Sequence, residues 1–598
     1  MRNGRVRFAL ALCAVTGLFC AGKPEPLNIM IIAVDTLRAD HLGCYGYSRD
    51  TSPNIDDLAA RGVLCERCTS PAPWTLPSFS SVFTSLYPTQ HGAETVHSTL
   101  RESVPTLAGI LKEHGYATGA VINAPALKPA YAVNRGFDHY HMTPEEGRVA
   151  DGTTRDALGW LDAIREEPFF AFVHYFDPHL SYSPPKPYDK RFTVDYDGRI
   201  GYSFNLEGFS RVRDSMFVQM QQLTEDDRHR IVGLYDGEIG FTDIAIADLL
   251  TGLDERGLRD NTLIILLSDH GEEFFEHGGF EHGHTLYEEL IHVPLLFSLP
   301  ERLPQGARLS RPVRLIDVAP TILDFLDIEA PSNFEGVSIR PLLEGKGQPR
   351  DAGNRLLPAG VAYAEALMHG REQKCVVAYP WKLVHEAGTE NQDLFNLEED
   401  PAELQNAAAV QPDRIDQLEN LLYKTLFGIS DTWYIEIAAD QEHPLFDIEI
   451  TVNKGLMPGD ISVHRVLDSA GDIVEPSCPL IIDRDGSRLR MKDLSFSGAL
   501  VLAFKIYPER FPIEFDFRID GRSAAGNTFL GEGLESPQAM PFTITGRRGR
   551  VASLTRPEDP PQAPYLLVWY EESRYQGDTS ISLDEETKKE LRALGYIQ

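Results

Sequence analysis

The first half of the chain alternates short apolar runs with amphipathic segments. Continuous apolar runs bounded by polar residues predict buried strands, and apolar positions spaced three to four residues apart predict helices. The expected strands are Asn28–Val34, Tyr116–Ile122, Phe169–Tyr175, Thr262–Ser268 and Val293–Ser298. The expected helices lie near residues 54–61, 77–86, 105–114, 153–165, 224–257 and 316–327. This alternation predicts a layered α/β/α domain with a mostly parallel sheet, which we place at residues 27–330.

A surface connection follows, because residues 330–360 are rich in glycine, proline and charged residues. Residues 361–428 contain two or three expected strands and one expected helix, too little to bury a core of their own. We therefore expect residues 331–428 to form a small α+β C-terminal subdomain that docks on the first domain.

The pattern changes after about residue 430, where apolar and polar residues alternate with a period of two, as in half-buried antiparallel strands. The expected strands are Trp433–Ala438, Phe446–Val452, Ala499–Ile506, Ile513–Ile519, Phe542–Thr545 and Tyr565–Tyr570. This pattern predicts an appended β-sandwich-like domain at residues 431–572. The tail at residues 583–598 contains an amphipathic helical pattern that begins at Asp584.

Composition narrows the class of protein. The chain has 598 residues, 42% of them hydrophobic and 24% charged, which is typical of a globular protein with two or three domains. Its 56 lysines and arginines stand against 89 aspartates and glutamates, so the formal net charge is −33. Such a chain repels nucleic acid and anionic membranes at long range. An anionic ligand must therefore be attracted locally, by a metal ion or by backbone amides.

The N-terminus resembles a targeting segment. Arg2, Arg5 and Arg7 precede an apolar stretch from Phe8 to Ala21, which is short for a membrane span but suits a secretory signal. We expect residues 1–22 to be a signal peptide and the protein to be exported to the periplasm or the extracellular space, without a transmembrane span. A lipid anchor at Cys20 is the alternative, although the preceding Phe19 fits it poorly.

Five cysteines follow this segment, so at most two disulfides form and one thiol is left over. Cys65 and Cys68 make a single C-x-x-C pair. Because a zinc knuckle needs four ligands, a disulfide or two unmodified thiols fit this pair better. The pairing stays open.

Polar residues of metal-ligand type follow two of the expected strands. Asp35 comes directly after the first strand, and Asp269 and His270 come directly after the strand at Thr262–Ser268. His282 and His284 follow within fifteen residues. In open α/β sheets ligands bind beyond the carboxyl ends of the strands. The cluster favours a metal site over the alternative of a solvated histidine-rich surface.

Two further segments carry candidate chemistry. Pro77 suits the first turn of a helix, so Thr75 lies at the helix start, where amides attract an anion and a metal can activate the hydroxyl. The plainer interpretation is a helix cap. Asp177 and His179 follow the strand Phe169–Tyr175 and are candidates for metal or anion binding, with an ordinary Asp-Pro turn as the alternative.

Together these motifs resemble the sulfatase branch of the alkaline phosphatase superfamily over residues 27–425. The matching segments are Asn28–Asp35 with Arg38-Ala39-Asp40, Ser52–Asp56, Thr84–Pro88 with His91-Gly92, Ser268–Glu272 with Tyr287-Glu288-Glu289, and Asp393–Leu397. The resemblance implies an alkaline-phosphatase-like fold and a metal-dependent ester hydrolase.

The chain departs from the family pattern at the nucleophile. Thr75 stands at the cysteine or serine that sulfatases oxidise to formylglycine, and Phe79 stands at the arginine of the same motif. The family's pair of aspartates is reduced to Asp35-Thr36, and Asn123 replaces a usual lysine. These changes resemble the superfamily's phosphodiesterases and phosphonate hydrolases that use a threonine nucleophile.

The resemblance implies roles for the site residues. The first metal would be held by Asp35, Thr75, Asp269 and His270. Asp177 and His179, together with His282 or His284, would complete a second metal site or bind substrate oxygens. Asn123 is a candidate oxyanion donor, and His91 would support the site from behind. The ligands favour zinc or manganese over calcium.

Three functions follow as hypotheses. The first is a hydrolase of phosphodiesters or phosphonate esters. In it the Thr75 hydroxyl attacks the phosphorus and forms a covalent threonyl ester, and water then hydrolyses that ester. The second is a sulfatase that acts without formylglycine. The third is a catalytically inactive, exported binding protein. The expected substrate is a small anionic ester or a sulfated or phosphorylated glycan or lipid, and the oligomeric state stays open.

Overall fold

The fold was analysed in a computed structural model of the chain. It describes residues 26–143, 150–164, 168–193, 196–206, 219–349, 358–386 and 391–429. Beyond residue 430 it describes 432–439, 446–452, 461–467, 481–482, 488–494, 498–504, 513–525, 528–530, 542–544, 565–571, 579 and 581–593. The expected signal peptide at residues 1–22 lies outside the described residues, as does Cys478.

A nine-stranded sheet organises the first part of the chain, in the order β10-β2-β9-β6-β1-β5-β3-β4, with β11 also paired to β2. The strands are β1 Asn28–Val34, β2 Val63–Thr69, β3 Ala117–Ile122, β4 His139–Met142, β5 Phe169–Tyr175, β6 Thr262–Leu267, β9 His292–Ser298, β10 Ala307–Leu309 and β11 Val313–Arg314. Strands β6, β1, β5, β3 and β4 run parallel, whereas β9 runs antiparallel to both neighbours. The prediction of a mostly parallel sheet is confirmed.

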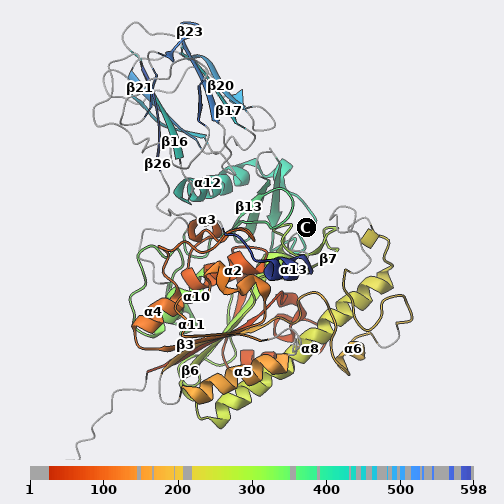
Figure 1. The fold of residues 1–598 in the computed structure, drawn as a ribbon. Helices are drawn as coiled ribbons and strands as arrows, with labels where there is room; N and C mark the ends of the chain where they lie inside the picture. The colour runs from red at the N-terminus through yellow and green to blue at the C-terminus, as the bar shows by residue number, and fades with distance from the viewer. Residues whose placement is uncertain are drawn as a thin grey trace, which may run out of the picture.

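Helices cover both faces of this sheet, which gives the predicted three layers (Figure 1). In β1, Ile29, Ile31 and Ala33 face one core, and the alternate residues face the other. Both sets are buried, which explains why the strand is apolar throughout. The main helices are α2 Thr75–Thr84, α4 Leu107–Glu113 and α10 Val318–Phe325 on the first face, and α1 Pro53–Ala60, α5 Ala150–Ala163 and α8 Glu225–Glu255 on the second.

Short elements connect these layers. The short helices are α3 Pro88–His91, α6 Tyr188–Arg191, α9 Glu288–Ile291 and α11 Arg340–Leu343. The 3₁₀ turns are η1 Ala39–His41, η2 Gly43–Tyr45, η3 Pro125–Leu127, η4 Pro129–Tyr131, η6 Arg259–Asn261, η7 Leu315–Asp317 and η8 Ala408–Val410. A two-stranded hairpin, β7 Glu273–Phe274 with β8 Phe280–Glu281, follows β6.

A second, antiparallel sheet packs on the first part of the chain. It consists of β12 Ala362–Ala364, β13 Gln373–Ala378, β14 Trp381–Glu386 and β15 Gln392–Asn396, and α12 Pro412–Ile429 contacts β13 and β14. The sequence predicted two or three strands here, and the described residues form four, so this prediction was wrong. Strand β12 is only three residues long, which is too short to show an alternation of apolar and polar residues. Tyr87 and Ile316 of the first part pack with Val376 and Leu383 of this sheet.

Two more sheets follow residue 430, and they are largely antiparallel as the alternating pattern predicts (Figure 1). One contains β16 Thr432–Ala439, β18 Ile461–Leu467, β21 Gly498–Phe504, β24 Thr528–Leu530 and β26 Tyr565–Glu571. The other contains β17 Phe446–Val452, β19 Ile481–Ile482, β20 Arg488–Leu494, β22 Ile513–Ile519, β23 Arg522–Ser523 and β25 Phe542–Ile544. The domain boundaries drawn from the sequence stay predictions.

The C-terminal tail returns to the first part of the chain. Helix α13, Glu585–Ala593, buries Leu591, and Leu583 just before it is buried in the same core as α2 and α10. The tail is also tied by backbone hydrogen bonds, from the Ile581 amide to the His97 carbonyl at 2.9 Å and from the Thr99 amide to the Thr579 carbonyl at 2.8 Å. The α13 helix contacts η3, directly after Asn123.

Two other sequence expectations concern the whole chain. No helix among the described residues has the length and hydropathy needed to cross a membrane. Cys44, Cys65, Cys68 and Cys375 are free thiols, so Cys65 and Cys68 form no disulfide in this structure.

We predict that Leu591→Ala destabilises the first part of the chain, although it lies at the far end of the sequence. Leu591 is fully buried, and truncating such a leucine costs about 2–4 kcal/mol. The change should lower the melting temperature of the protein by several degrees. Leu404→Ala is the control, because Leu404 is 69% exposed and should change it little. Equal effects of the two substitutions would contradict the packing of the tail.

Candidate active site

Four neighbouring parallel strands end at one edge of the sheet, and the candidate residues follow them. Asp35 follows β1 and Asp269 lies just after β6, whose residue Leu267 is in register with Ala33. His179 lies in the loop after β5, and Asn123 directly follows β3. The Asp35 amide donates to the Tyr175 carbonyl at 2.9 Å, which fixes Asp35 at the end of its strand. The sheet therefore brings these residues together, as expected for the carboxyl edge.

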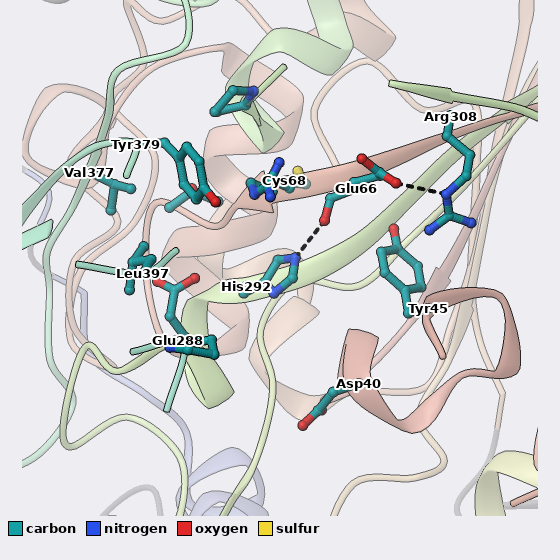
Figure 2. Close-up of a pocket in the computed structure, with 14 residues that line it drawn as sticks. Asp40, Tyr45, Glu66, Cys68, Glu288, His292, Arg308, Val377, Tyr379 and Leu397 are labelled. Carbon is teal, nitrogen blue, oxygen red and sulfur yellow. Dashed lines mark hydrogen bonds and ion pairs between the residues drawn. The ribbon is translucent and has the colours of Figure 1, made fainter. Parts of the chain in front are cut away.

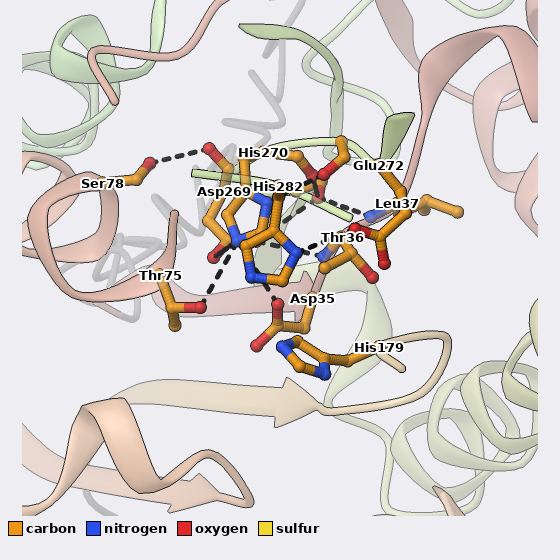
Figure 3. A network of polar contacts seen from close by, with 12 residues as sticks. Asp35, Thr36, Leu37, Thr75, Ser78, His179, Asp269, His270, Glu272 and His282 are labelled. Atoms are coloured by element: carbon orange, nitrogen blue, oxygen red, sulfur yellow. Dashed lines mark hydrogen bonds and ion pairs between the residues drawn. The ribbon is translucent and has the colours of Figure 1, made fainter. Parts of the chain in front are cut away.

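Asp35, Asp269 and His270 form a compact cluster in which one ligand atom of each lies within 4.8 Å of the others (Figure 3). His270 Nε2 lies 3.2 Å from Asp269 Oδ2 and 3.6 Å from Asp35 Oδ1. All three side chains are fully buried. His270 Nδ1 lies 2.9 Å from the Gly271 carbonyl, which accepts its proton, so Nε2 is the ring nitrogen that faces the carboxylates.

The carboxylates of Asp35 and Asp269 accept few hydrogen bonds. Both carboxylate oxygens of Asp35, and Oδ2 of Asp269, are buried without a hydrogen-bond partner. Burial and the nearby charge of Asp269 raise the pKa of Asp35 well above its usual value. Burial alone would lower the pKa of His270, but the charge of Asp269 raises it instead. A cation would stabilise buried carboxylates in this state, and the donor set is of the kind that holds a divalent metal.

Thr75 is the first residue of α2 and points at this cluster. Its hydroxyl oxygen lies 3.3 Å from His270 Nε2, and the residue is fully buried. The helix is anchored beneath the cluster because the hydroxyls of Ser70 and Ser78 donate to the Asp269 carbonyl, at 2.5 and 2.8 Å. The helix start that the sequence predicts for Pro77 therefore carries Thr75 to the carboxylates.

The backbone after Asp35 adopts a conformation that a β-branched residue rarely takes. Thr36 has φ of 53°. This left-handed turn directs the Thr36 amide toward Asp269 Oδ1 at 3.4 Å, and the Tyr235 hydroxyl donates to the Thr36 carbonyl at 2.7 Å. Strain of this kind persists where surrounding contacts hold it, and it is common at functional sites.

His282 lies against His270, with ring centroids 4.5 Å apart, and against His179, with centroids 4.9 Å apart. Its Nδ1 lies 2.8 Å from a carboxylate oxygen of Glu272, whose other oxygen accepts from the Tyr182 hydroxyl at 2.8 Å. Figure 3 shows His282 in front of His270 and His179 beside Asp35. His179 Nδ1 lies 2.7 Å from the Leu180 carbonyl.

The other sequence candidates are not in the group formed by Asp35, Asp269 and His270. His284 Nε2 contacts Glu273 Oε2 at 2.7 Å, so its ring is engaged by a different carboxylate from that of His282. Asp177 is buried, but the group that the structure gathers within 4.8 Å contains only Asp35, Asp269 and His270 among the described residues. Asn123 is buried at the end of β3. Their roles remain predictions.

His174 lies within the predicted strand Phe169–Tyr175, and the sequence alone suggested no role for it. It lies on β5 in register with Ala33 of β1, and its Nε2 is 3.2 Å from Asp35 Oδ2. Burial lowers the pKa of its imidazole to about 4. The sequence offered one signal for this residue, which is a single histidine in an otherwise apolar strand. His174 lies one position before Tyr175, whose carbonyl accepts the hydrogen bond from the Asp35 amide.

His91 supports α2 from behind. Its Nε2 lies 3.0 Å from the Ser81 hydroxyl and 3.2 Å from the Pro77 carbonyl, and its Nδ1 accepts from the Ala93 amide at 3.1 Å. This arrangement requires a neutral ring, and burial lowers the pKa of His91 to about 3.

A separate pocket of about 340 Å³ opens beside β2 and β9 (Figure 2). It shares no residue with the cluster of Asp35, Asp269 and His270. Its carboxylates already have cationic partners: Glu66 pairs with Arg308 at 2.7 Å, Glu288 with Lys382 at 2.9 Å, and Asp40 with Arg38 at 2.8 Å. Unlike Asp35 and Asp269, these three carboxylates are each paired with a lysine or an arginine.

Comparison with known proteins agrees with this geometry. The family described as "Sulfatase" matches residues 27–328, and the family described as "N-sulphoglucosamine sulphohydrolase, C-terminal" matches residues 275–430. The Delta 4,5-hexuronate-2-O-sulfatase of Bacteroides thetaiotaomicron is 23% identical over 430 residues, covering 67% of this chain and 87% of that protein.

Two solved structures share the fold. A protein in complex with its substrate D-glucosamine-2-N,6-O-disulfate has a TM-score of 0.57 and 21% identity, covering 67% of this chain and 98% of that one. The phosphonate monoester hydrolase of Agrobacterium radiobacter has a TM-score of 0.54 and 22% identity, covering 67% of this chain and 96% of that one.

We predict that His91 makes the enzyme sensitive to acid. Its pKa is about 3 in the folded state against 6.5 ordinarily, so below pH 6.5 the unfolded chain binds more protons and the free energy of unfolding falls as the pH falls. Between pH 6.5 and 5 this amounts to about 2 kcal/mol.

The test compares the free energy of unfolding at pH 7 and pH 5 for the wild type and His91→Gln. The variant should be less stable at pH 7 but should lose less on acidification. His114→Gln, at an exposed histidine, is the control and should behave as the wild type does. An equal acid loss in His91→Gln and wild type would contradict the prediction.

Proposed function

This chain belongs to the sulfatase family, and we propose that it is a metal-dependent hydrolase of phosphodiesters or phosphonate esters that uses Thr75 as its nucleophile. The matched family covers just over half of the chain, and hydrolysis is the activity of its members. The observation that carries the proposal is the Thr75 hydroxyl, 3.3 Å from His270 and beside two buried carboxylates, three of whose four oxygens have no hydrogen bond.

The residues fit a divalent metal. Asp35, Asp269 and His270 present two carboxylates and one imidazole nitrogen, and the orphaned oxygens of both aspartates would gain a cationic partner. Mixed oxygen and nitrogen ligands favour zinc or manganese over calcium, which prefers six to eight oxygen ligands. When bound, the ion supplies positive charge that lowers the pKa of the Thr75 hydroxyl and offsets the charge of the substrate.

The chain's own residues then orient the attack. Thr75 is held at the start of α2, where backbone amides favour the anionic group of the substrate. Its oxygen attacks phosphorus in line with the leaving group, the bond to the leaving oxygen breaks, and a covalent threonyl ester forms. Water then attacks the same phosphorus and restores the Thr75 hydroxyl.

The threonine favours phosphorus over sulfur as the reacting atom. A formylglycine hydrate carries two hydroxyls on one carbon, so one of them can expel a bound sulfate by cleavage of the carbon–oxygen bond. Thr75 has a single hydroxyl, so its ester is released only by attack of water on the central atom. Phosphorus accepts that second attack more readily than the sulfur of a sulfate ester.

His282 is positioned to protonate the leaving group. Glu272 accepts from the Tyr182 hydroxyl and contacts His282 Nδ1, an arrangement that orients the ring and stabilises its protonated form. The other ring nitrogen, Nε2, is then the proton donor to the leaving oxygen. His179, whose ring lies edge-to-face with that of His282, would contact the substrate's oxygens or a second metal, and Asn123 and Asp177 stay candidates for the same roles.

A sulfatase that acts without formylglycine is the second candidate. Its support is the hexuronate sulfatase relative and the likeness to a protein solved with a disulfated glucosamine. A sulfated or phosphorylated glycan or lipid is therefore the proposed substrate, met after export of the protein. An inactive binding protein is disfavoured, because the buried carboxylates of Asp35 and Asp269 would be retained at a free-energy cost without use.

We predict that Thr75→Ala abolishes hydrolysis, lowering kcat/KM by at least about 10³-fold, because a nucleophile and not only a binding contact is lost. The zinc- or manganese-loaded enzyme would be assayed for 4-nitrophenol release from bis(4-nitrophenyl) phosphate, 4-nitrophenyl phenylphosphonate and 4-nitrophenyl sulfate. Thr84→Ala, at the other end of α2, is the control.

The three substrates separate the hypotheses. Faster cleavage of the phosphorus esters supports the proposal, and faster cleavage of the sulfate supports the second candidate. Activity that survives in Thr75→Ala would contradict the nucleophile assignment. Failure to turn over all three substrates would support the inactive binding protein.

We predict that His282→Gln slows substrates with poor leaving groups much more than those with good ones. A 4-nitrophenolate departs without a proton, whereas an alkoxide requires one, and general acid catalysis contributes typically 10²–10⁴-fold. The measurement is kcat/KM for a series of esters with leaving groups of increasing pKa. His284→Gln is the matched control, because His284 contacts Glu273. A loss independent of the leaving group in His282→Gln would contradict the role.

A further inference from the structure

We propose that Trp74 is a positioning residue for Thr75, and that one loop of the second sheet, residues 365–372, holds both Trp74 and the hairpin that carries His282. The inference rests on the proposed function, because it takes Thr75 as the nucleophile and His282 as the acid. The loop joins β12 to β13, and neither Thr75 nor His282 belongs to that sheet. The second sheet would thus set the geometry of a reaction to which it supplies neither group.

Trp74 determines how helix α2 begins. Its backbone is extended, with φ of −161° and ψ of 164°, and its carbonyl accepts from the Ser78 amide at 3.3 Å, which is the first turn of the helix. Its side chain makes no cap hydrogen bond to α2. Because Trp74 directly precedes Thr75, a rotation of its backbone would move the Thr75 hydroxyl, which lies 3.3 Å from His270 Nε2.

The indole of Trp74 is anchored on the loop at residues 365–372. Trp74 is fully buried, and its Nε1 donates to the Ala366 carbonyl at 2.7 Å. The Glu365 amide donates to the Pro71 carbonyl at 3.0 Å, so the loop holds the segment before the nucleophile at two points. Phenylalanine would fill the same apolar space. What tryptophan adds here is therefore the hydrogen bond that ties the start of α2 to the second sheet.

The loop is shaped to present that carbonyl. Ala366 has φ of 66°, a left-handed conformation that alanine rarely adopts and that persists where surrounding contacts hold it. Its amide donates to the Glu372 carboxylate at 2.9 Å, and the Lys374 ammonium lies 3.4 Å from the same oxygen. Glu365 accepts from the Thr89 amide at 2.8 Å, which ties the loop to α3 as well.

The same loop holds the hairpin that carries His282. The amides of Met368 and His369 both donate to the Gly283 carbonyl, at 2.8 and 2.9 Å. A Cβ built on Gly283 would lie 3.0 Å from the Met368 side chain and 3.7 Å from the Trp74 Cβ, so the three segments meet at this point. Because Gly283 directly follows His282, the loop sets the acid and the nucleophile relative to each other.

Trp74→Phe tests the nucleophile side of the loop. We expect kcat to fall by about 10- to 100-fold with little change in KM, because a small misplacement of a reacting group costs about this much. The loss should be equal for esters with good and poor leaving groups, because the contacts to the hairpin remain. Trp160→Phe is the matched control, since Trp160 is a buried tryptophan of α5 in the core on the other face of the sheet. It should change kcat little.

Glu372 gives an independent test of the loop itself. Glu372→Ala removes the acceptor that holds the Ala366 turn, so it should lower kcat and also make kcat depend more steeply on the pKa of the leaving group. Glu372→Gln keeps an oxygen that can accept from the Ala366 amide. It should therefore recover most of the activity that Glu372→Ala loses.

The outcomes separate this inference from the proposed function. A kcat in Trp74→Phe equal to that in Trp160→Phe, even with a lower melting temperature, would give Trp74 a structural role only and overturn the inference. Equal losses in the two Glu372 variants would also overturn it, and both results leave the proposed function intact. If Trp74→Phe does not fold, the Glu372 variants decide the question alone. Activity that survives in Thr75→Ala would overturn both proposals.

Discussion

The charge of two buried carboxylates is the constraint around which the site is built. Asp35 and Asp269 are fully buried at the ends of adjacent parallel strands, with three of their four oxygens lacking a hydrogen bond. Removing two such ions from water costs several kcal/mol each in real proteins. The fold tolerates this because both faces of β1 and β6 are packed by helices, so the strand ends cannot move apart to admit water.

The neighbouring segments are arranged to hold that charged edge in one geometry. The Asp269 carbonyl accepts from Ser70 and Ser78, which links α2 to β6 and sets the position of Thr75. Arg38, three residues after Asp35, donates to the Glu272 carbonyl at 2.9 Å and so links the first strand's loop to the hairpin that carries His282. Backbone carbonyls thus hold the segments that carry the candidate side chains in one arrangement.

The sequence alone was enough to predict those parts of the site that follow from hydrophobic periodicity and from the ends of strands. Asp35, Asp269 and His270 were predictable because each directly follows an apolar run, and Thr75 because it begins a helix. Strand β2 was missed, since Glu66 and Arg67 interrupt its apolar run at a bulge between Cys65 and Cys68. His282 and His284 could not be separated, because only the path of the hairpin and Gly283, with φ of 79°, sends their rings to Glu272 and Glu273 respectively.

The charges of the named residues also argue for the class of substrate. The side chains assigned to the site are carboxylates, imidazoles, hydroxyls and the amide of Asn123, and Phe79 stands where the family pattern has an arginine. In the proposed mechanism a divalent ion balances Asp35 and Asp269 and the acid form of His282 balances Glu272, so little positive charge would be left over. The chain as a whole, at −33, adds repulsion. Such a site suits an ester with a single negative charge, which phosphodiesters, phosphonate monoesters and sulfate monoesters carry, and it disfavours the doubly charged phosphate monoesters.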